Sequence, residues 1–206
     1  ERPDSAAASI YEGCLLIIPD TSPSVMIIPT GVFDFLQDTN DFYFPSLIGS
    51  YLRIVRMIVF LLALLLTPVW FLLIQNPEYI PPLLDFIKIE HPTSVPVIMQ
   101  LQILEIVIDA LKLASLNTPN ALSNSFSVIG ALVLGEFAIA AKWFTAEVVL
   151  YMAFVAITNF AQPSYELGYA FKLCRMIILI LTAIFNLWGF IAGLVMSGLL
   201  LSFDMY

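Results

Sequence analysis

The pattern of apolar and polar positions is most informative near the end of the chain. Residues Met176–Phe203 read MIILILTAIFNLWGFIAGLVMSGLLLSF, 28 residues without a charge, in which Asn186 is the strongest polar interruption. About 20 apolar residues suffice for a helix to cross the hydrocarbon core of a bilayer. A soluble helix of this length would have to be apolar on every side, which small domains rarely accommodate. The pattern therefore predicts a membrane-spanning helix.

Four further apolar stretches precede this one and are separated by polar segments. We expect helices over Ile54–Ile74, Val95–Ala114, Phe126–Ala141 and Val148–Ala161. Pro68 lies inside the first stretch and predicts a kink near Leu64–Thr67, because proline lacks an amide donor. The sequence therefore predicts a mostly α fold, a polytopic membrane helical bundle of about five membrane segments, unless one middle segment is re-entrant.

Lysine and arginine residues in the short loops indicate the orientation of such a bundle. If the N-terminus is cytoplasmic, that side holds six bases, and the opposite side holds Lys88 and Lys142. The six are Arg2, Arg53, Arg56, Lys112, Lys172 and Arg175. The distribution favours a cytoplasmic N-terminus.

Residues 1–45 have the pattern of a soluble segment. Two short apolar and β-branched stretches, Glu12–Ile18 and Ser24–Thr30, flank a cluster of turn formers. This pattern predicts a β-hairpin with its turn at Pro19–Ser24. The segment also carries most of the net charge of −8, since residues 1–52 hold seven acids and one base.

The N-terminal segment also bears on domain organisation. Because the chain opens on Glu1 without an initiator methionine, we expect a fragment whose N-terminal aqueous domain has been cut away. We therefore divide the chain into two parts. Residues 1–45 are the C-terminal end of a cytoplasmic domain with a β-hairpin, and residues 46–206 are a helical transmembrane domain.

Ionisable residues inside a membrane segment are costly, so each is a functional candidate. On a helix over Val95–Ala114, the side chains of Gln102, Glu105, Asp109 and Lys112 fall within a wedge of roughly 80°. Three interpretations stay open: a face that lines a pore or cavity, a buried interhelical network that includes an Asp109–Lys112 pair, and a helix on the membrane surface.

Other helices carry weaker candidates. Glu136 stands alone in an apolar stretch, where either a buried partner such as Lys142 or Lys112 or a role in proton relay would explain it. The fourth helix contains Ala153, Ala156, Thr158 and Asn159, which suit either close packing or a narrow neutral constriction. In the last helix, Gly189, Gly193 and Ser197 form a small-residue face that brings helix backbones together.

Composition excludes several classes of function. No basic patch is present to neutralise phosphates, so nucleic acid is not an expected partner. The single histidine, His91, lies before a proline, and no catalytic or nucleotide-binding motif occurs. The two cysteines, Cys14 and Cys174, show no metal-ligand spacing. We therefore expect no enzyme activity, no cofactor and no metal site, with the lipid bilayer as the main environment.

Two loops and one apolar stretch resemble the membrane domain of the GerA family. These are SLNTP at residues 115–119, which includes Asn117, Thr118 and Pro119; IGALVLG at residues 129–135; and PSYEL at residues 163–167, which includes Pro163, Tyr165 and Glu166. The opening residues ERPD and the wording of the hairpin are also similar. The two loop motifs look closer to the stage V sporulation protein AF branch than to the nutrient-receptor A subunits.

The resemblance covers essentially the whole chain and has functional implications. It implies an integral multi-pass protein of the endospore inner membrane that acts in germination together with other germination membrane proteins. It also implies a large cytoplasmic N-terminal domain and a homo-oligomer that forms a cation-conducting channel. Two other functions stay open: a non-conducting scaffold or receptor subunit that recruits partner proteins, and a secondary transporter for a small solute.

Overall fold

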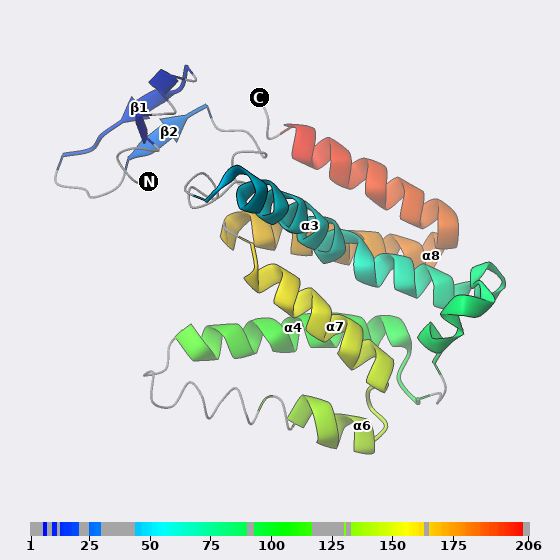
Figure 1. Ribbon diagram of the computed structural model, residues 1–206. Coiled ribbons are helices and arrows are strands. Elements are labelled where there is room, and N and C mark those ends of the chain that lie inside the picture. Colours follow the sequence, from blue (N-terminus) through cyan, green and yellow to red (C-terminus); the bar gives the residue numbers. More distant parts are fainter. Residues whose placement is uncertain are drawn as a thin grey trace.

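A small two-stranded sheet precedes a bundle of helices in the computed structural model (Figure 1). The structure describes residues 6–7, 10–11, 13–20, 25–29, 44–89, 93–116, 130, 133–162 and 165–203. The loop motif residues Asn117, Thr118, Pro119 and Pro163 lie outside these ranges.

The sheet consists of β1 (Leu15–Ile17) and β2 (Met26–Ile28), which pair antiparallel. Leu16 lies opposite Ile27, and both are half-buried, whereas their neighbours along each strand are exposed. This alternation is the period of two that a strand imposes on its side chains. The predicted pair of strands is confirmed, and residues 21–24 of the predicted turn lie outside the described residues.

The first long helix is α3 (Ser46–Gln75), which continues through Pro68 as one element. Its buried residues lie mostly in its second half and include Ala63, Thr67 and Trp70. Two short 3-10 helices follow, η2 (Pro77–Tyr79) and η3 (Pro82–Ile87). The indole Nε1 of Trp70 donates to the carbonyl of Ile87 (3.1 Å), which ties this connection back onto α3.

Helices α4 (Val97–Leu116) and α7 (Ala146–Phe160) form close to where the sequence predicts them. Gln100, which is fully buried, joins their beginnings. Its amide nitrogen donates to the Thr93 hydroxyl (2.7 Å) and its amide oxygen accepts from the backbone of Thr145 (2.9 Å). Thr145 is in turn the N-cap of α7, where its hydroxyl accepts from the amide of Val148.

The segment between α4 and α7 differs from the regular helix expected over Phe126–Ala141. Val133–Phe137 forms a π-helix, η4, and α6 (Ala138–Ala140) is a single turn. Residues 126–129 and 131–132 lie outside the described residues. Gly135 lies within the π-helix, and the positive φ of Lys142 (58°) follows the end of α6. The apolar composition predicted a helix here, but it did not indicate that part of the helix would be a π-helix.

The last helix, α8 (Tyr165–Phe203), corrects the prediction of one uninterrupted crossing. Asn186 has non-helical dihedral angles (φ 54°, ψ −130°), and α8 is two helices joined across this kink. Figure 1 shows the chain reversing direction there, so that residues 187–203 run back along residues 165–185. The end of α8 thereby returns towards the beginning of α3 (Figure 1).

Small residues form the seam between the two halves of α8. A Cβ added to Gly189 would lie 1.9 Å from the carbonyl oxygen of Leu181, and one added to Gly193 would lie 3.0 Å from the Cα of Ile178. Ser197 is buried, and its hydroxyl donates to the carbonyl of Gly193 (2.8 Å). The two helices approach this closely because the two glycines have no side chain.

Side chains from four helices fill the core. Helix α3 packs against α8 and α7, and α4 packs against α7 and α8. One cluster of buried apolar residues joins α3, α4 and α7 around Trp70, Leu104 and Met152. A second joins α3 to α8 around Leu64, Phe171 and Ile178. The polar residues described below lie where these helices meet.

Two of the described helices are long and apolar enough, by length and composition, to cross a membrane. They are Ser46–Gln75 and Leu167–Leu200, of which the second contains the break at Asn186. The predicted number of about five membrane segments is therefore not confirmed. Helix α4 carries three ionisable residues, and α7 has only 15 residues.

Candidate functional site

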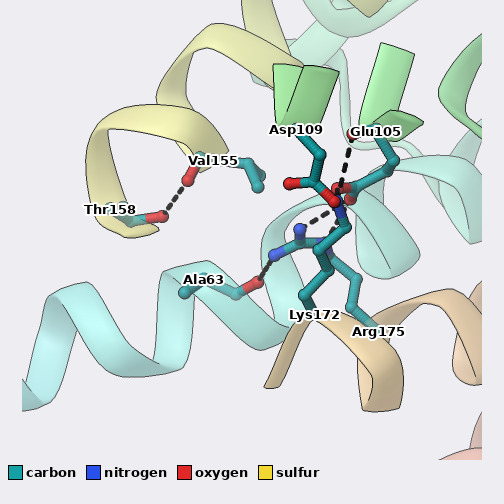
Figure 2. A network of polar contacts seen from close by, with 7 residues as sticks. All are labelled: Ala63, Glu105, Asp109, Val155, Thr158, Lys172 and Arg175. Atoms are coloured by element: carbon teal, nitrogen blue, oxygen red, sulfur yellow. Dashed lines mark hydrogen bonds and ion pairs between the residues drawn. The ribbon is translucent and has the colours of Figure 1, made fainter. Parts of the chain in front are cut away.

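Four charged side chains meet between α4 and α8. Glu105 and Asp109 come from α4, where the i,i+4 spacing places them on one face, and Lys172 and Arg175 come from α8 at i,i+3. Figure 2 shows the four side chains pointing toward one another. Arg175 is 0% exposed and Glu105 is 1% exposed, so this ion cluster lies inside the bundle.

Arg175 connects three helices. Its Nε donates to Oε1 of Glu105 (2.7 Å), and its Nη2 lies 2.6 Å from the same oxygen. Its Nη1 donates to the backbone carbonyl of Ala63 on α3 (Figure 2). Ala63 belongs to the turn that precedes Pro68, where the proline has no amide to donate to the carbonyl of Leu64. A guanidinium with fixed donors suits such a junction.

Lys172 completes the ion cluster. Its Nζ donates to the backbone carbonyl of Glu105 (3.0 Å), lies 3.5 Å from Oε2 of Glu105 and pairs with Oδ2 of Asp109. The Lys172 side chain is 8% exposed and the Asp109 side chain is 33% exposed. Asp109 is therefore the member of the ion cluster that reaches the surface of the single chain.

The charges of the ion cluster balance. Two carboxylates face one ammonium and one guanidinium, so the cluster is formally neutral. Breaking one buried pair typically costs several kcal/mol because the remaining charge is left uncompensated. The ion cluster therefore ties α3, α4 and α8 together, and removing a single charge from it is expected to be more harmful than removing a matched pair.

A small cavity of about 20 Å³ adjoins the ion cluster, between α4, α7 and α8. Its lining includes Asp109, Lys112, Ala156, Asn159, Tyr169 and Lys172. The ammonium of Lys112 lies 4.8 Å from the centre of the Tyr169 ring, over its face. The amide oxygen of Asn159 is buried and has no hydrogen-bond partner among the described residues. The volume is enough for about one water-sized occupant.

The structure brings together some of the residues singled out in the sequence and separates others. The cavity is lined by four of them: Asp109, Lys112, Ala156 and Asn159. Glu105 belongs to the ion cluster but does not line the cavity. Thr158 is buried and donates to the carbonyl of Val155 (2.8 Å), so its hydroxyl is used within α7 (Figure 2).

Like Glu105 and Thr158, three further candidates do not line the cavity. Gln102 is half-buried, and Ala153 is exposed on α7. Glu136 is exposed on η4, which differs from the buried pairing considered for it. The motif residues Tyr165 and Glu166 form the first turn of α8.

The sequence pattern does not indicate the two bases of the ion cluster as site residues. It predicts Lys172 and Arg175 in a cytoplasmic loop, whereas both are buried in α8 and therefore do not report on orientation. Asp109 pairs with Lys172 on α8, a partner outside its own helix that local spacing does not predict. Two features of the sequence could have indicated the two bases. A pair of bases at i,i+3 precedes a long apolar stretch, and two carboxylates at i,i+4 lie in another apolar helix.

No metal centre is formed by the residues that the structure describes, since no three histidine, cysteine, aspartate or glutamate side chains gather there. The ion cluster contains two carboxylates together with two fixed cations. The interactions seen in it are ion pairs and hydrogen bonds.

Comparison with known proteins places the chain in a family. The family described as Bacillus/Clostridium GerA spore germination protein matches residues 1–203. Stage V sporulation protein AF of Bacillus subtilis (strain 168) is 39% identical over 193 residues, which cover 94% of this chain and 39% of that protein. No solved structure matches the chain.

Two further relatives come from the same organism. Spore germination protein KA is 30% identical over 199 residues, which cover 95% of this chain and 37% of that protein. The protein named uncharacterized membrane protein YfkQ is 28% identical over 196 residues, 94% of this chain and 38% of that protein. The chain thus spans about two fifths of the length of these relatives. The match over nearly all of its residues, together with the apolar helices, makes this chain a membrane protein of the GerA spore germination family.

Proposed function

We propose that this chain is the membrane part of a germination protein that conducts cations out of the spore. The observation that carries the proposal is the ion cluster with its adjoining cavity, in which Asp109 is the partly exposed carboxylate. When Lys172 is not paired with it, the carboxylate of Asp109 sets a local negative potential, which favours cations over anions. The names of the relatives, which refer to sporulation and spore germination, supply the process.

The break in α8 supports a multi-pass arrangement. Residues 165–185 are about 31 Å long as a helix, enough to cross the hydrocarbon core, and residues 187–203 return. If α3, α4, the segment through η4, α7 and both halves of α8 all cross, both termini lie on the same side. We assign that side to the cytoplasm and the membrane to the inner membrane of the endospore.

We place the conducting path between copies of the chain. The cavity beside the ion cluster has a volume of about 20 Å³, which is far smaller than a continuous path across a membrane. Large apolar side chains are exposed along α3, α7 and α8, including Leu47, Phe154 and Trp188. Lipid, further copies of the chain and other germination membrane proteins are the expected contacts of these side chains, and an ion path would form between copies.

A pair of neutral double variants tests the proposal in the full-length protein in planar bilayers, with its germination partners present. Asp109→Asn with Lys172→Met removes the exposed carboxylate and keeps the charge balance. The control, Asp85→Asn with Lys88→Met, removes the solvent-exposed pair at the end of η3. We expect single-channel steps from the unmodified protein and the control. We expect weaker selectivity for cations over anions, or a smaller conductance, from the Asp109 variant.

A second function, a non-conducting scaffold that recruits other germination proteins, is favoured by the charge balance of the ion cluster. A cluster with every charge paired can serve packing alone. Silent bilayers with intact protein and partners would support the scaffold and contradict the channel. Flux of a small solute coupled to an ion would instead indicate a transporter.

A further inference from the structure

The ammonium of Lys172 lies among oxygen atoms contributed by α4. Around it are the backbone carbonyl of Glu105 (3.0 Å), Oε2 of Glu105 (3.5 Å) and the paired Oδ2 of Asp109. Backbone carbonyl oxygens replace the hydration shell of the ion in K⁺-channel filters, and rings of carboxylates line other cation channels. The environment of this ammonium thus has the chemistry of a monovalent-cation site.

The other base of the ion cluster has a different role. Arg175 is fully buried, and its guanidinium is held by Glu105 and by the carbonyl of Ala63. Arg175 therefore already compensates the charge of Glu105. Lys172 compensates Asp109, and it does so with a compact charge on a flexible stem. The Lys172 side chain can therefore withdraw while Glu105 stays paired with Arg175, so that only Asp109 loses its partner.

The cavity provides the space next to this ammonium. Asp109 and Lys172 both line it, and the Asp109 side chain is one-third exposed. The amide oxygen of Asn159 in the same wall is buried and has no hydrogen-bond partner among the described residues. An unpartnered acceptor on a residue that lines the same cavity as a carboxylate suits a donor or a cation.

We infer that the oxygen atoms around the Lys172 ammonium form a monovalent-cation site, which Lys172 occupies as a tethered counter-ion. A free cation reaches Asp109 only when the lysine side chain withdraws. The inference rests on the proposed function in one respect: in a channel, this exchange would control access of the permeating ion to Asp109. Binding of a cation to the vacated site does not depend on conduction and is tested separately.

The test uses the full-length protein in detergent and measures its melting temperature against KCl. Lys172→Met should vacate the site, so its melting temperature should rise by roughly 1–3 °C per tenfold increase in KCl once binding begins. N-methylglucamine chloride at equal ionic strength should not reproduce the rise. The unmodified protein, Lys172→Arg and the double variant Lys172→Met with Asp109→Asn should show no rise specific to potassium.

Each outcome decides the inference. A Lys172→Met protein whose melting temperature is the same in both salts overturns it. So does a single variant that fails to fold at any KCl concentration while the neutral double variant folds, because a free cation then cannot replace the lysine. The channel is judged apart from this. If Lys172→Met melts in a potassium-dependent way but the protein shows no current in bilayers, the cation site stands and the channel is rejected. If the protein conducts but the melting of Lys172→Met does not depend on potassium, only the cation site is rejected.

Discussion

Asn76 and Asn186 exchange two side-chain hydrogen bonds although 110 residues separate them. The Nδ2 of Asn76 donates to Oδ1 of Asn186 (2.6 Å), and the Nδ2 of Asn186 donates to Oδ1 of Asn76 (2.9 Å). Asn76 is the C-cap of α3, and Asn186 is the residue at which α8 reverses. This amide pair therefore joins the end of the first long helix to the tip of the last one.

Substitutions at Asn186 should distinguish the contribution of the amide pair to stability from that of backbone strain at the turn. Its dihedral angles (φ 54°, ψ −130°) belong to a region that side-chain-bearing residues rarely adopt and that glycine adopts readily. Asn186→Ala loses the pair and keeps the strain, so we expect it to be less stable than Asn186→Gly by about 1 kcal/mol. Thermal unfolding of the full-length protein in detergent measures the difference.

Asn76→Ala is the control that leaves the backbone turn unchanged. It removes the same two exposed hydrogen bonds, together with the one from Nδ2 of Asn76 to the carbonyl of Leu72 (3.0 Å), and should cost about 0.5–1.5 kcal/mol. Equal stability of Asn186→Ala and Asn186→Gly would contradict a strained turn at this residue.

The glycines of α8 should respond according to what a new side chain would meet. In Gly189→Ala the added Cβ lies 1.9 Å from the carbonyl oxygen of Leu181, so the two halves of α8 must separate. Gly193→Leu places a larger group against Ile178, where the Cβ alone lies 3.0 Å from the backbone. We expect each change to cost about 1–3 kcal/mol or more, seen as a lower melting temperature.

Gly198→Ala is the matched control in the same helix, since a Cβ there meets nothing within 4 Å. It should melt at or slightly above the temperature of the unmodified protein, because alanine favours a helix over glycine. If Gly189→Ala and Gly198→Ala melt alike, the seam between the two halves of α8 is not as close as the structure has it.

Glu105→Gln should be strongly destabilising, by about 3–5 kcal/mol, because it leaves the buried Arg175 without its carboxylate. Asp85→Asn, which breaks an exposed pair with Lys88, should cost less than about 1 kcal/mol. The measurement is the yield and melting temperature of the full-length protein.

A double variant provides the control for buried charge. Adding Arg175→Met to Glu105→Gln removes both charges of the pair and should recover part of the lost stability. A double variant that is no more stable than Glu105→Gln would show that uncompensated charge is not the cause of the loss.

Local periodicity was enough to predict several elements. The helix expected over Val95–Ala114 forms as α4 (Val97–Leu116), and the one expected over Val148–Ala161 forms as α7. The two strands of the hairpin also form where the alternation of apolar residues placed them. These elements depend on side chains a few residues apart, whose spacing the sequence displays directly.

The interpretation of the polar face of α4 needed the tertiary structure. The sequence placed Glu105 and Asp109 on one side of a helix, but their partners, Lys172 and Arg175, lie 63 to 70 residues further along the chain. No local spacing encodes such a pairing. It follows from the packing of α4 against α8, which determines that the carboxylates meet two buried bases.

The sequence by itself determined that the last 28-residue uncharged stretch is helical and apolar, because composition and period are local properties. Only the tertiary structure decided that this helix reverses at Asn186. A polar residue within an apolar helix can remain helical. In this chain the turn at Asn186 is accompanied by hydrogen bonds to Asn76 and by the close approach that Gly189 and Gly193 allow. Those interactions join residues distant in the chain, so they exist only once the helices have packed.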